Sequence, residues 1–256
     1  MIIQNNGIIT NDNYYQDREY ITASMVKQAL QGSKLQYDYA MEQTAESEAM
    51  LVGSAFHALV LEPDVFKSTY AFEPNMDKRT KAGKEYIAEW KELNKNIPIH
   101  LPGKYEEMLF DMKESLVKHP LYAELFVFNE YSEVETIKLF DLSGYKCKSK
   151  IDYYNSIRNY IVDIKTCNSV SEDDIIESIE KYHYDVQAAF YTDGIKADKF
   201  YFVFVQKKKP YDVLFVEYYY DLNNARVKYF NGLSLIHRYN STTDRIYANY
   251  NSFLKL

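Results

Sequence analysis

The chain contains only two cysteines, Cys147 and Cys167, among its 256 residues. This number excludes a zinc or iron–sulfur centre held by four thiolates. One cysteine lies on each side of a predicted hairpin, a placement that favours two small buried side chains over a disulfide. No apolar run approaches the roughly 18 residues of a membrane span, and no basic segment followed by an apolar core opens the sequence. We therefore expect no membrane partner and a cytoplasmic location.

Positive charge is not in excess either, because 30 Lys and Arg stand against 37 Asp and Glu and give a formal net charge of -7. Non-specific affinity for nucleic acid comes from neutralising phosphates, so this balance argues against a protein that coats nucleic acid indiscriminately. It is compatible with a nucleic-acid enzyme that has a local basic track. Tryptophan occurs once, whereas tyrosine occurs 26 times and phenylalanine 14 times. Buried ring edges are the simpler explanation of the tyrosines, and platforms that stack on bases are the alternative.

The order of the predicted elements indicates an α/β protein with a central mixed β-sheet flanked by helices. We expect one domain over residues 1–256, with a helical amino-terminal part at about 20–126, a core at about 130–220 and a last helix at about 221–240. Apolar periodicity predicts amino-terminal helices over 21–42, 44–62, the second half of 74–95 and 103–126, the last interrupted at Pro120. Alternating and β-branched runs predict strands over 134–140, 145–154, 160–166, 199–206 and 211–220. One long helix is expected from about Ser171 to Ala197, and Asp221 is a plausible cap of the last helix.

The hairpin at residues 148–166, KSKIDYYNSIRNYIVDIKT, holds the first candidate residues. With the turn centred near 157–158, Asp152 lies opposite Asp163, and directly paired residues have Cβ atoms about 4.5–5.5 Å apart. The i, i+2 spacing of Asp163 and Lys165 places both side chains on one face of the strand. A surface ion pair, worth ~0–1 kcal/mol, is the simpler interpretation.

A divalent cation is the alternative interpretation of the two aspartates. The run YIVDIKT is apolar enough for a central strand, where a carboxylate pair is costly unless a cation lies between the groups. Two aspartates and the backbone carbonyl of Ile164 suit Mg²⁺ better than zinc.

Four further residues are candidates for the same site. Gln187 and Tyr191 have i, i+4 spacing and lie on one helical face, although a solvated glutamine and a core tyrosine would give the same pattern. His57 lies within an apolar helix, where a satisfied core histidine is the common case. Glu135 is the tentative acidic residue of the preceding strand, but Glu133 has the same strand parity and the choice between them stays open.

These segments resemble the PD-(D/E)XK nucleases, with Asp152 as the first acid, Asp163 as the second and Lys165 as the lysine of D-x-K. Ile151 stands where that motif has proline. The Q-x-x-x-Y pattern is similar to that of RecE-like and lambda-type phage exonucleases, and GSAFHALVLEP at 53–63 resembles the segment before the nuclease core of the exonuclease VIII (RecE) group. RTKAGKEY at 79–86 resembles the basic segment of that group.

The resemblance implies one or two Mg²⁺ ions, with Mn²⁺ as a possible substitute, in a restriction-endonuclease-like core. The implied ligands are His57, Asp152, Asp163, the Ile164 carbonyl and tentatively Glu135, with Lys165, Gln187 and Tyr191 as further catalytic residues. Candidate contacts to DNA are Arg79, Lys81 and Lys84 from the basic segment. Lys148 and Lys150 are added because, with Lys146, they share the strand parity of Asp152. The KKK run at 207–209 is expected to be an exposed cluster at a turn.

The implied activity is a processive 5′→3′ exodeoxyribonuclease on linear double-stranded DNA that leaves 3′ single strands. The implied partners are DNA ends and a single-strand annealing recombinase, and the implied assembly is a homo-oligomeric ring, in the host cytoplasm if a phage encodes the chain. An endonuclease or an end-processing nuclease with the same core, or a DNA-binding homologue without turnover, is the alternative. An iron–sulfur RecB-type nuclease is disfavoured by the cysteine count.

Overall fold

The computed structural model describes residues 9, 14, 16–43, 47–219 and 222–241. The expected cap Asp221 lies outside these residues. The first helical region is predicted as one helix over 21–42 but forms two, α1 (Ala23–Gln31) and α2 (Lys34–Glu42). Ser33 starts α2 with a capping box, in which its hydroxyl accepts from the backbone N–H of Gln36 and the Gln36 side chain accepts from the backbone N–H of Ser33. This strong local start signal ends the first helix at Gly32.

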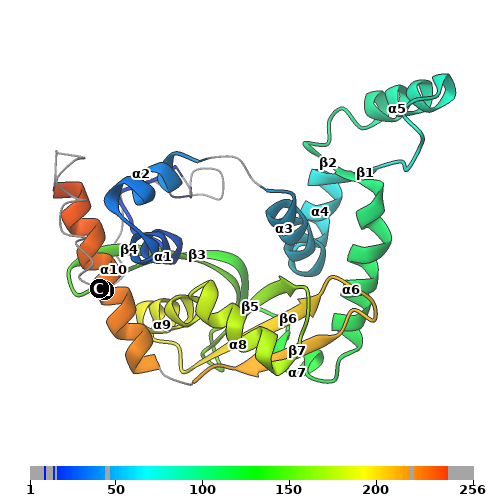
Figure 1. The fold of residues 1–256 in the computed structure, drawn as a ribbon. Helices are drawn as coiled ribbons and strands as arrows, with labels where there is room; N and C mark the ends of the chain where they lie inside the picture. The colour runs from blue at the N-terminus through cyan, green and yellow to red at the C-terminus, as the bar shows by residue number, and fades with distance from the viewer. Residues whose placement is uncertain (1–8, 10–13, 15, 44–46, 220–221, 242–256) are drawn as a thin grey trace.

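The next segments form α3 (Glu48–Leu61), α4 (Pro63–Thr69), α5 (Lys81–Leu93), α6 (Glu106–Lys118) and α7 (Tyr122–Leu125). Pro120 separates α6 from α7, as predicted. The sequence did not predict a short parallel pair, β1 (Tyr70–Glu73) and β2 (Ile99–Pro102), which flanks α5. This pair forms the base from which α5 projects away from the rest of the molecule (Figure 1).

A mixed five-stranded sheet forms the centre of the fold, in the order β3-β4-β5-β6-β7. The strands are β3 (Ser132–Leu142), β4 (Tyr145–Asn155), β5 (Tyr160–Cys167), β6 (Lys199–Gln206) and β7 (Val213–Glu217). The β5–β6 pair is parallel and the other neighbours are antiparallel. The expected α/β class and mixed sheet are therefore confirmed.

The parallel pair is connected by α8 (Glu172–Lys181) and α9 (Tyr184–Ile195), where the sequence predicted a single helix. The two helices are separated at His183, whose backbone has a left-handed conformation with φ 49. The chain after β7 forms α10 (Leu222–Ser241).

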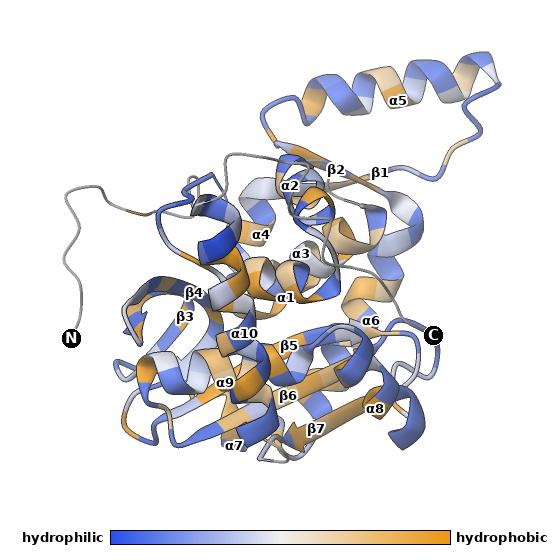
Figure 2. Cartoon of the chain, turned by 60° about the vertical axis from the view of Figure 1, so that its left-hand side comes forward, coloured by the Kyte–Doolittle hydropathy of each residue, from blue (hydrophilic) through white to orange (hydrophobic). Residues whose placement is uncertain are grey.

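Helices cover both faces of the sheet and bury two apolar clusters. On one face α9 packs against the sheet, and α1 and α10 pack against α9 and each other, around Phe190, Phe202 and Tyr229. On the other face α3 and α6 pack around Phe56 and Leu109. Figure 2 shows the hydrophobic stretches gathered in the strands and in the helices that lie on them. Among the described residues, no helix combines the length and the apolar character needed to cross a membrane.

Candidate metal centre

Three side chains from different elements meet at one point of the sheet. His57 comes from α3, Glu135 from β3 and Asp152 from β4, and one ligand atom of each lies within 4.8 Å of the others. His57 Nδ1 is 3.4 Å from Asp152 Oδ2 and 3.7 Å from Glu135 Oε1. Of the two glutamates, Glu135 lies in this group, whereas Glu133 pairs with Lys138 on its own strand.

The backbone at Glu135 is distorted in a way that aims its side chain at the site. Glu135 has φ 47, a left-handed conformation that is strained for a residue with a Cβ atom. It lies opposite Asp152, between the regular pairs Val134–Tyr153 and Thr136–Ile151. On β4, next to Asp152, the side chains also switch from one face of the sheet to the other. Ile151 packs in the apolar cluster on one face, whereas Tyr153 packs in the cluster on the opposite face. A regular strand would place these two residues on the same face.

Asp152 also joins β4 to β5 where their ladder ends. Backbone pairing between these strands extends from Asn155–Tyr160 to Tyr153–Val162. Beyond it, Asp152 Oδ2 accepts a hydrogen bond of 2.7 Å from the backbone N–H of Ile164. The carbonyl of Ile164, a predicted ligand, lies 2.9 Å from His57 Nε2.

Asp163 lies next to the group of three without belonging to it. Its carboxylate is buried, with Oδ1 accepting a 2.6 Å hydrogen bond from Gln187 Nε2 and Oδ2 in an ion pair with Lys165. The predicted proximity of Asp163, Lys165 and Gln187 is thus present. Tyr191, one turn after Gln187, packs in the apolar cluster beside Phe200.

Lys27 of α1 is a neighbour of this site that the sequence did not reveal. Its ammonium donates to Gln187 Oε1 at 3.3 Å, so that Gln187 connects Lys27 to Asp163. The ammonium groups of Lys27 and Lys165 lie 5.5 Å and 5.0 Å from the ring centroid of Tyr184. A lysine within an amphipathic helix gives no local signal, since its role depends on the packing of α1 against α9.

The charges of the site shift the pKa values of its members. Burial alone would keep the His57 ring neutral, but the charges and hydrogen bonds of Asp152 and Glu135 outweigh it and raise the pKa of His57 to about 10. Burial opposes ionisation of Asp152 as well, yet the His57 cation and the Ile164 N–H hold the pKa of Asp152 below its usual value. In the absence of a metal ion, a protonated His57 therefore neutralises part of the acidic charge.

Burial has the larger effect on the second acid. It raises the pKa of Asp163 despite the nearby Lys165, and the charge of Asp152 adds to the rise. Burial also lowers the pKa of Lys27 to about 8, with the Lys165 ammonium acting in the same direction. The pKa of Lys165 is raised, because Asp163 and Asp152 outweigh its burial.

The basic residues expected to contact DNA have different surroundings. Lys148 is fully buried, and its ammonium is bound by Tyr14 O, Asp17 O and Asp17 Oδ1 at 2.6, 2.9 and 3.0 Å. This position fastens the segment before α1 to β4 and does not present Lys148 to a phosphate. Lys150 pairs with Glu135 Oε2 at 2.7 Å and so borders the candidate centre.

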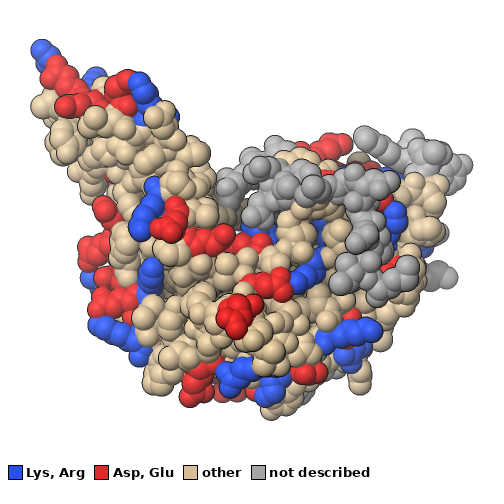
Figure 3. Space-filling model, turned by 180° about the vertical axis from the view of Figure 1, so that it is seen from behind, with Lys and Arg blue, Asp and Glu red and all other residues tan. Residues whose placement is uncertain are grey.

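The remaining basic candidates lie on the projecting arm, residues 74–98. Arg79 is exposed and forms two hydrogen bonds of 3.0 Å to the carboxylate of Asp77, and Lys81 lies 3.8 Å from Glu85. Lys84 is exposed on α5. Figure 3 shows basic and acidic side chains side by side on this arm. Its charge is therefore mixed rather than uniformly positive.

The donor set of the centre fits a hard divalent cation. Two carboxylates and one imidazole converge there, and oxygen-rich sets of this kind suit Mg²⁺ or Mn²⁺. The Ile164 carbonyl lies at the other ring nitrogen of His57, Nε2, and not among the converging atoms. Glu135 Oε1 is buried without a hydrogen-bond partner among the described residues, as expected for an oxygen that a cation would satisfy.

A mixed sheet with an acid on one strand, D-x-K on the next and a helix-borne glutamine beside them defines the PD-(D/E)XK-like class of fold. The chain belongs to the family described as "PDDEXK-like domain of unknown function (DUF3799)", whose profile matches residues 22–241.

The fold is shared with a solved structure. A candidate exonuclease from Eubacterium rectale aligns with a TM-score of 0.66 at 17% identity, over 93% of this chain and 89% of that chain. A phage-related exonuclease from Haemophilus somnus 129PT aligns with a TM-score of 0.37 at 18% identity, over 65% of this chain and 87% of that chain. The first of these shows a common fold along nearly the whole chain, and the second is too distant to support an argument. No curated protein matches the chain.

Proposed function

We propose that the chain is a metal-dependent exodeoxyribonuclease that hydrolyses phosphodiester bonds of linear double-stranded DNA, in the 5′→3′ direction, and leaves 3′ single strands. The observation that carries the proposal is the meeting of His57, Glu135 and Asp152 beside the Asp163–Lys165 pair. The fold shared with the Eubacterium rectale protein, itself described as an exonuclease candidate, supports the same conclusion. So does the resemblance of the motifs to the RecE group.

In this proposal His57, Glu135 and Asp152 would hold Mg²⁺ or Mn²⁺, with Asp163 and the Ile164 carbonyl as further ligands. A bound ion of this kind lowers the pKa of water and neutralises charge on phosphoryl oxygens. Lys165 orients the attacking water and offsets the negative charge of the transition state. Gln187 holds the Asp163 carboxylate in a fixed orientation through its 2.6 Å hydrogen bond.

DNA is expected to approach past Lys150 and the arm that carries Arg79, Lys81 and Lys84. The resemblance further implies a homo-oligomeric ring around DNA and a partnership with a single-strand annealing recombinase. The mass of the particle in solution, measured by light scattering with and without linear DNA, tests the ring.

The test of the function is a nuclease assay on linear duplexes labelled at the 5′ or the 3′ end, with Mg²⁺ or Mn²⁺. We expect metal-dependent release of nucleotides from the 5′ ends, and loss of release in Asp163→Ala and Lys165→Ala with folding largely retained. Covalently closed circular DNA of the same sequence should resist cleavage. Cutting of the circle would favour an endonuclease, and an inactive wild type with either ion would contradict the proposal.

A further inference from the structure

Lys27 is a second lysine at the candidate centre, in a position that is unfavourable by charge alone. Its side chain is partly buried, and burial and the nearby Lys165 ammonium lower the pKa of Lys27 to about 8. Within the described part of the chain, Lys27 forms no ion pair. Its hydrogen bond goes to an uncharged group, the Oε1 atom of Gln187, at 3.3 Å. Lysines that are withdrawn from water usually pair with a carboxylate, so this contact is unusual.

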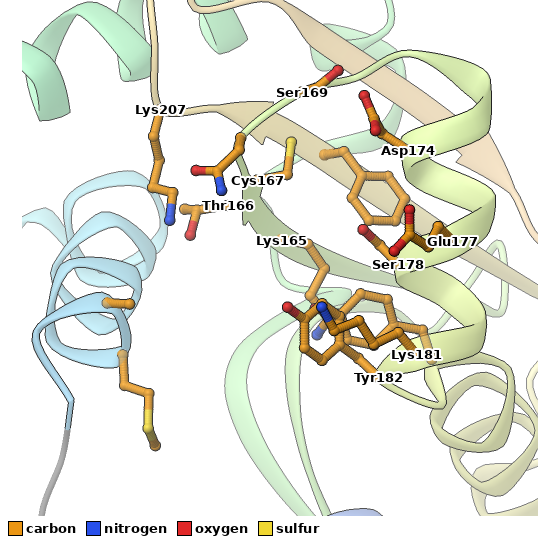
Figure 4. A pocket seen from close by; sticks show the side chains of 15 residues that line it. Lys165, Thr166, Cys167, Ser169, Asp174, Glu177, Ser178, Lys181, Tyr182 and Lys207 are labelled. Carbon is orange, nitrogen blue, oxygen red and sulfur yellow. The ribbon is translucent and has the colours of Figure 1, made fainter.

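Lys27 differs from the lysines that face an open cavity. Lys165 lines a pocket of ≈ 470 Å³ at the end of β5, together with Lys181 and Lys207, and Figure 4 shows these three side chains. Lys207 is the first residue of the 207–209 run, whose other two lysines are exposed as expected. Lys27 does not line this pocket. Its ammonium lies 5.5 Å from the ring centroid of Tyr184 and bonds to Gln187, so it is directed at protein groups and not into the pocket.

The amide of Gln187 has two ends of opposite character, and Lys27 and Asp163 each suit one of them. A lysine ammonium has only donors, and an ionised carboxylate has only acceptors. The amide therefore satisfies both neighbours in a single orientation, with Oε1 toward Lys27 and Nε2 donating to Asp163 Oδ1 at 2.6 Å. Rotation of the amide by half a turn would oppose two donors at one end and two acceptors at the other. The charged donor also polarises the amide, which makes its Nε2 a stronger donor to Asp163.

The orientation of this amide decides which oxygen of Asp163 is left for a cation. Gln187 occupies Oδ1. Oδ2 is buried and, among the described residues, has an ion pair with Lys165 but no hydrogen-bond donor. Oδ2 is therefore the oxygen that a bound ion could approach. A carboxylate that was free to rotate would lose this distinction between its two oxygens.

We propose that Lys27 is a positioning residue of the candidate centre, which fixes the amide of Gln187 and, through it, the Asp163 carboxylate that helps to hold the cation. The inference rests on the proposed function, because it gives Lys27 a part in the same centre. Lys27 touches neither the ion nor the DNA in this role, so it is not a catalytic residue. The amino-terminal helix α1 thereby contributes to the centre through α9, the helix on which it packs.

Metal affinity tests this role without DNA. Mn²⁺ is titrated into the full chain by calorimetry, for the wild type, Lys27→Met and Lys27→Arg. Removal of a nearby positive charge would by itself strengthen the binding of a cation. Loss of a supporting hydrogen bond acts in the opposite direction, so we expect Lys27→Met to bind Mn²⁺ about 10-fold more weakly. Lys27→Arg keeps the charge and the donors and should recover most of the affinity. Equal or tighter binding by Lys27→Met, or no binding by the wild type, would overturn the proposal.

A double-mutant cycle with Gln187→Ala shows whether Lys27 acts through the amide. In the Gln187→Ala background, Lys27→Met should cause no further loss of affinity, because the amide that Lys27 orients is already gone. Lys228→Met is the matched control, since Lys228 donates at 2.6 Å to Asp185 on the same helix α9 rather than to Gln187. It should keep the affinity of the wild type, and urea unfolding of each variant measures any change in stability. An equal loss in both backgrounds, or the same loss in Lys228→Met, would contradict a role through the amide.

Cleavage kinetics separate positioning from contact with the substrate. We expect Lys27→Met to lower kcat with little change in KM, because the lysine acts on the centre and not on the DNA. A raised KM with kcat unchanged would place Lys27 on the DNA and overturn the proposal. A wild type that binds Mn²⁺ in a Lys27-dependent way but cleaves no DNA would refute the nuclease function and leave the role of Lys27 standing. An active nuclease whose Mn²⁺ affinity does not depend on Lys27 would refute the role of Lys27 alone.

Discussion

Glu135 shows how a single strained residue can mark a functional site. Its left-handed backbone is unfavourable for any side chain with a Cβ atom, by about 1–2 kcal/mol. The distortion turns a carboxylate toward His57 and Asp152, which a regular strand at this position would not do. The strained backbone lowers the stability of the fold but places the Glu135 carboxylate in the candidate site, which is the pattern expected of a functional residue.

Substitution by glycine tests this strain directly. Glu135→Gly should be more stable than Glu135→Ala by about 1 kcal/mol, because glycine adopts positive φ without penalty. Glu133 provides the control, since it lies in regular pairing with Tyr154. There the order should reverse, with Glu133→Gly less stable than Glu133→Ala. Urea unfolding of the four variants gives the comparison, and the same order at both positions would contradict the strain.

Gln187 is expected to act through Asp163. Removing its side chain in Gln187→Ala takes away the donor to Asp163 Oδ1 and the acceptor of Lys27. Loss of such supporting hydrogen bonds typically lowers metal affinity or activity by about 10- to 100-fold. Mn²⁺ titration calorimetry and single-turnover cleavage report the two effects. Gln28→Ala, on an intermediate-exposure position of α1, is the control and should behave as the wild type.

At the scale of elements, the segment before α1 pairs with the part of β4 that does not pair with β5. Ile21 bridges to β4 there, with its N–H donating to Lys146 O and its carbonyl accepting from Lys148 N–H, both at 2.9 Å. The buried ammonium of Lys148 binds Tyr14 and Asp17 at the same edge. The segment thus satisfies backbone groups of β4 and leads into α1.

Lys148→Met should destabilise the fold by about 3 kcal/mol, because it leaves buried acceptors without their charged donor. Lys146→Ala, two residues away on the same strand, removes an exposed pair with Glu19 and should cost less than about 0.5 kcal/mol. Urea unfolding measures both. Equal small losses would show that the Lys148 contacts contribute little.

Most elements could be predicted because their signals are local. The runs that became β3 to β7 carry β-branched and aromatic residues between turn sequences. The α3 segment is apolar around its whole circumference, and α6 has apolar residues along one face. The pair β1–β2 was missed because four-residue strands far apart in sequence have almost no periodic signal. The division of 171–197 at His183 was missed because a left-handed residue without glycine is not evident in a helical pattern.

The alternation of side chains along a strand predicted part of the site and failed for another part. Asp163 and Lys165 lie together as their spacing indicated, and Gln187 lies beside them as the family resemblance implied. The parity argument failed at Lys148 because the strand changes its facing near Asp152 and because the segment around Tyr14 covers that lysine. The position of Lys27 beside Gln187 depends on how α1 packs against α9, which one sequence does not encode in any local pattern.

At the scale of the whole molecule, the candidate centre joins both layers of the fold, because α3 lies on one face of the sheet and α9 on the other. A bound cation should therefore stabilise the entire domain. At a concentration 100 times its Kd the ion adds about 2.7 kcal/mol, which corresponds to a rise in Tm of about 5–10 °C for a chain of this size.

A thermal scan with and without Mn²⁺ measures this rise. His57→Ala and Glu135→Gln should lose it, whereas His237→Ala, an exposed histidine on α10, should keep it. A rise of the same size in all variants would place the ion elsewhere.

The hydrogen bond from the Ile164 N–H to the Asp152 carboxylate has a practical implication for mutagenesis. There a side chain substitutes for the main-chain oxygen that a continuous ladder would have provided. Asp152→Ala would remove both a hydrogen bond between β4 and β5 and a candidate metal ligand. Loss of activity in that variant would therefore not distinguish a misfolded sheet from a lost ligand. Asp152→Asn keeps a side-chain oxygen that can accept the Ile164 hydrogen bond and removes only the negative charge. It is therefore the variant that tests the role of the charge without disturbing the pairing of the strands.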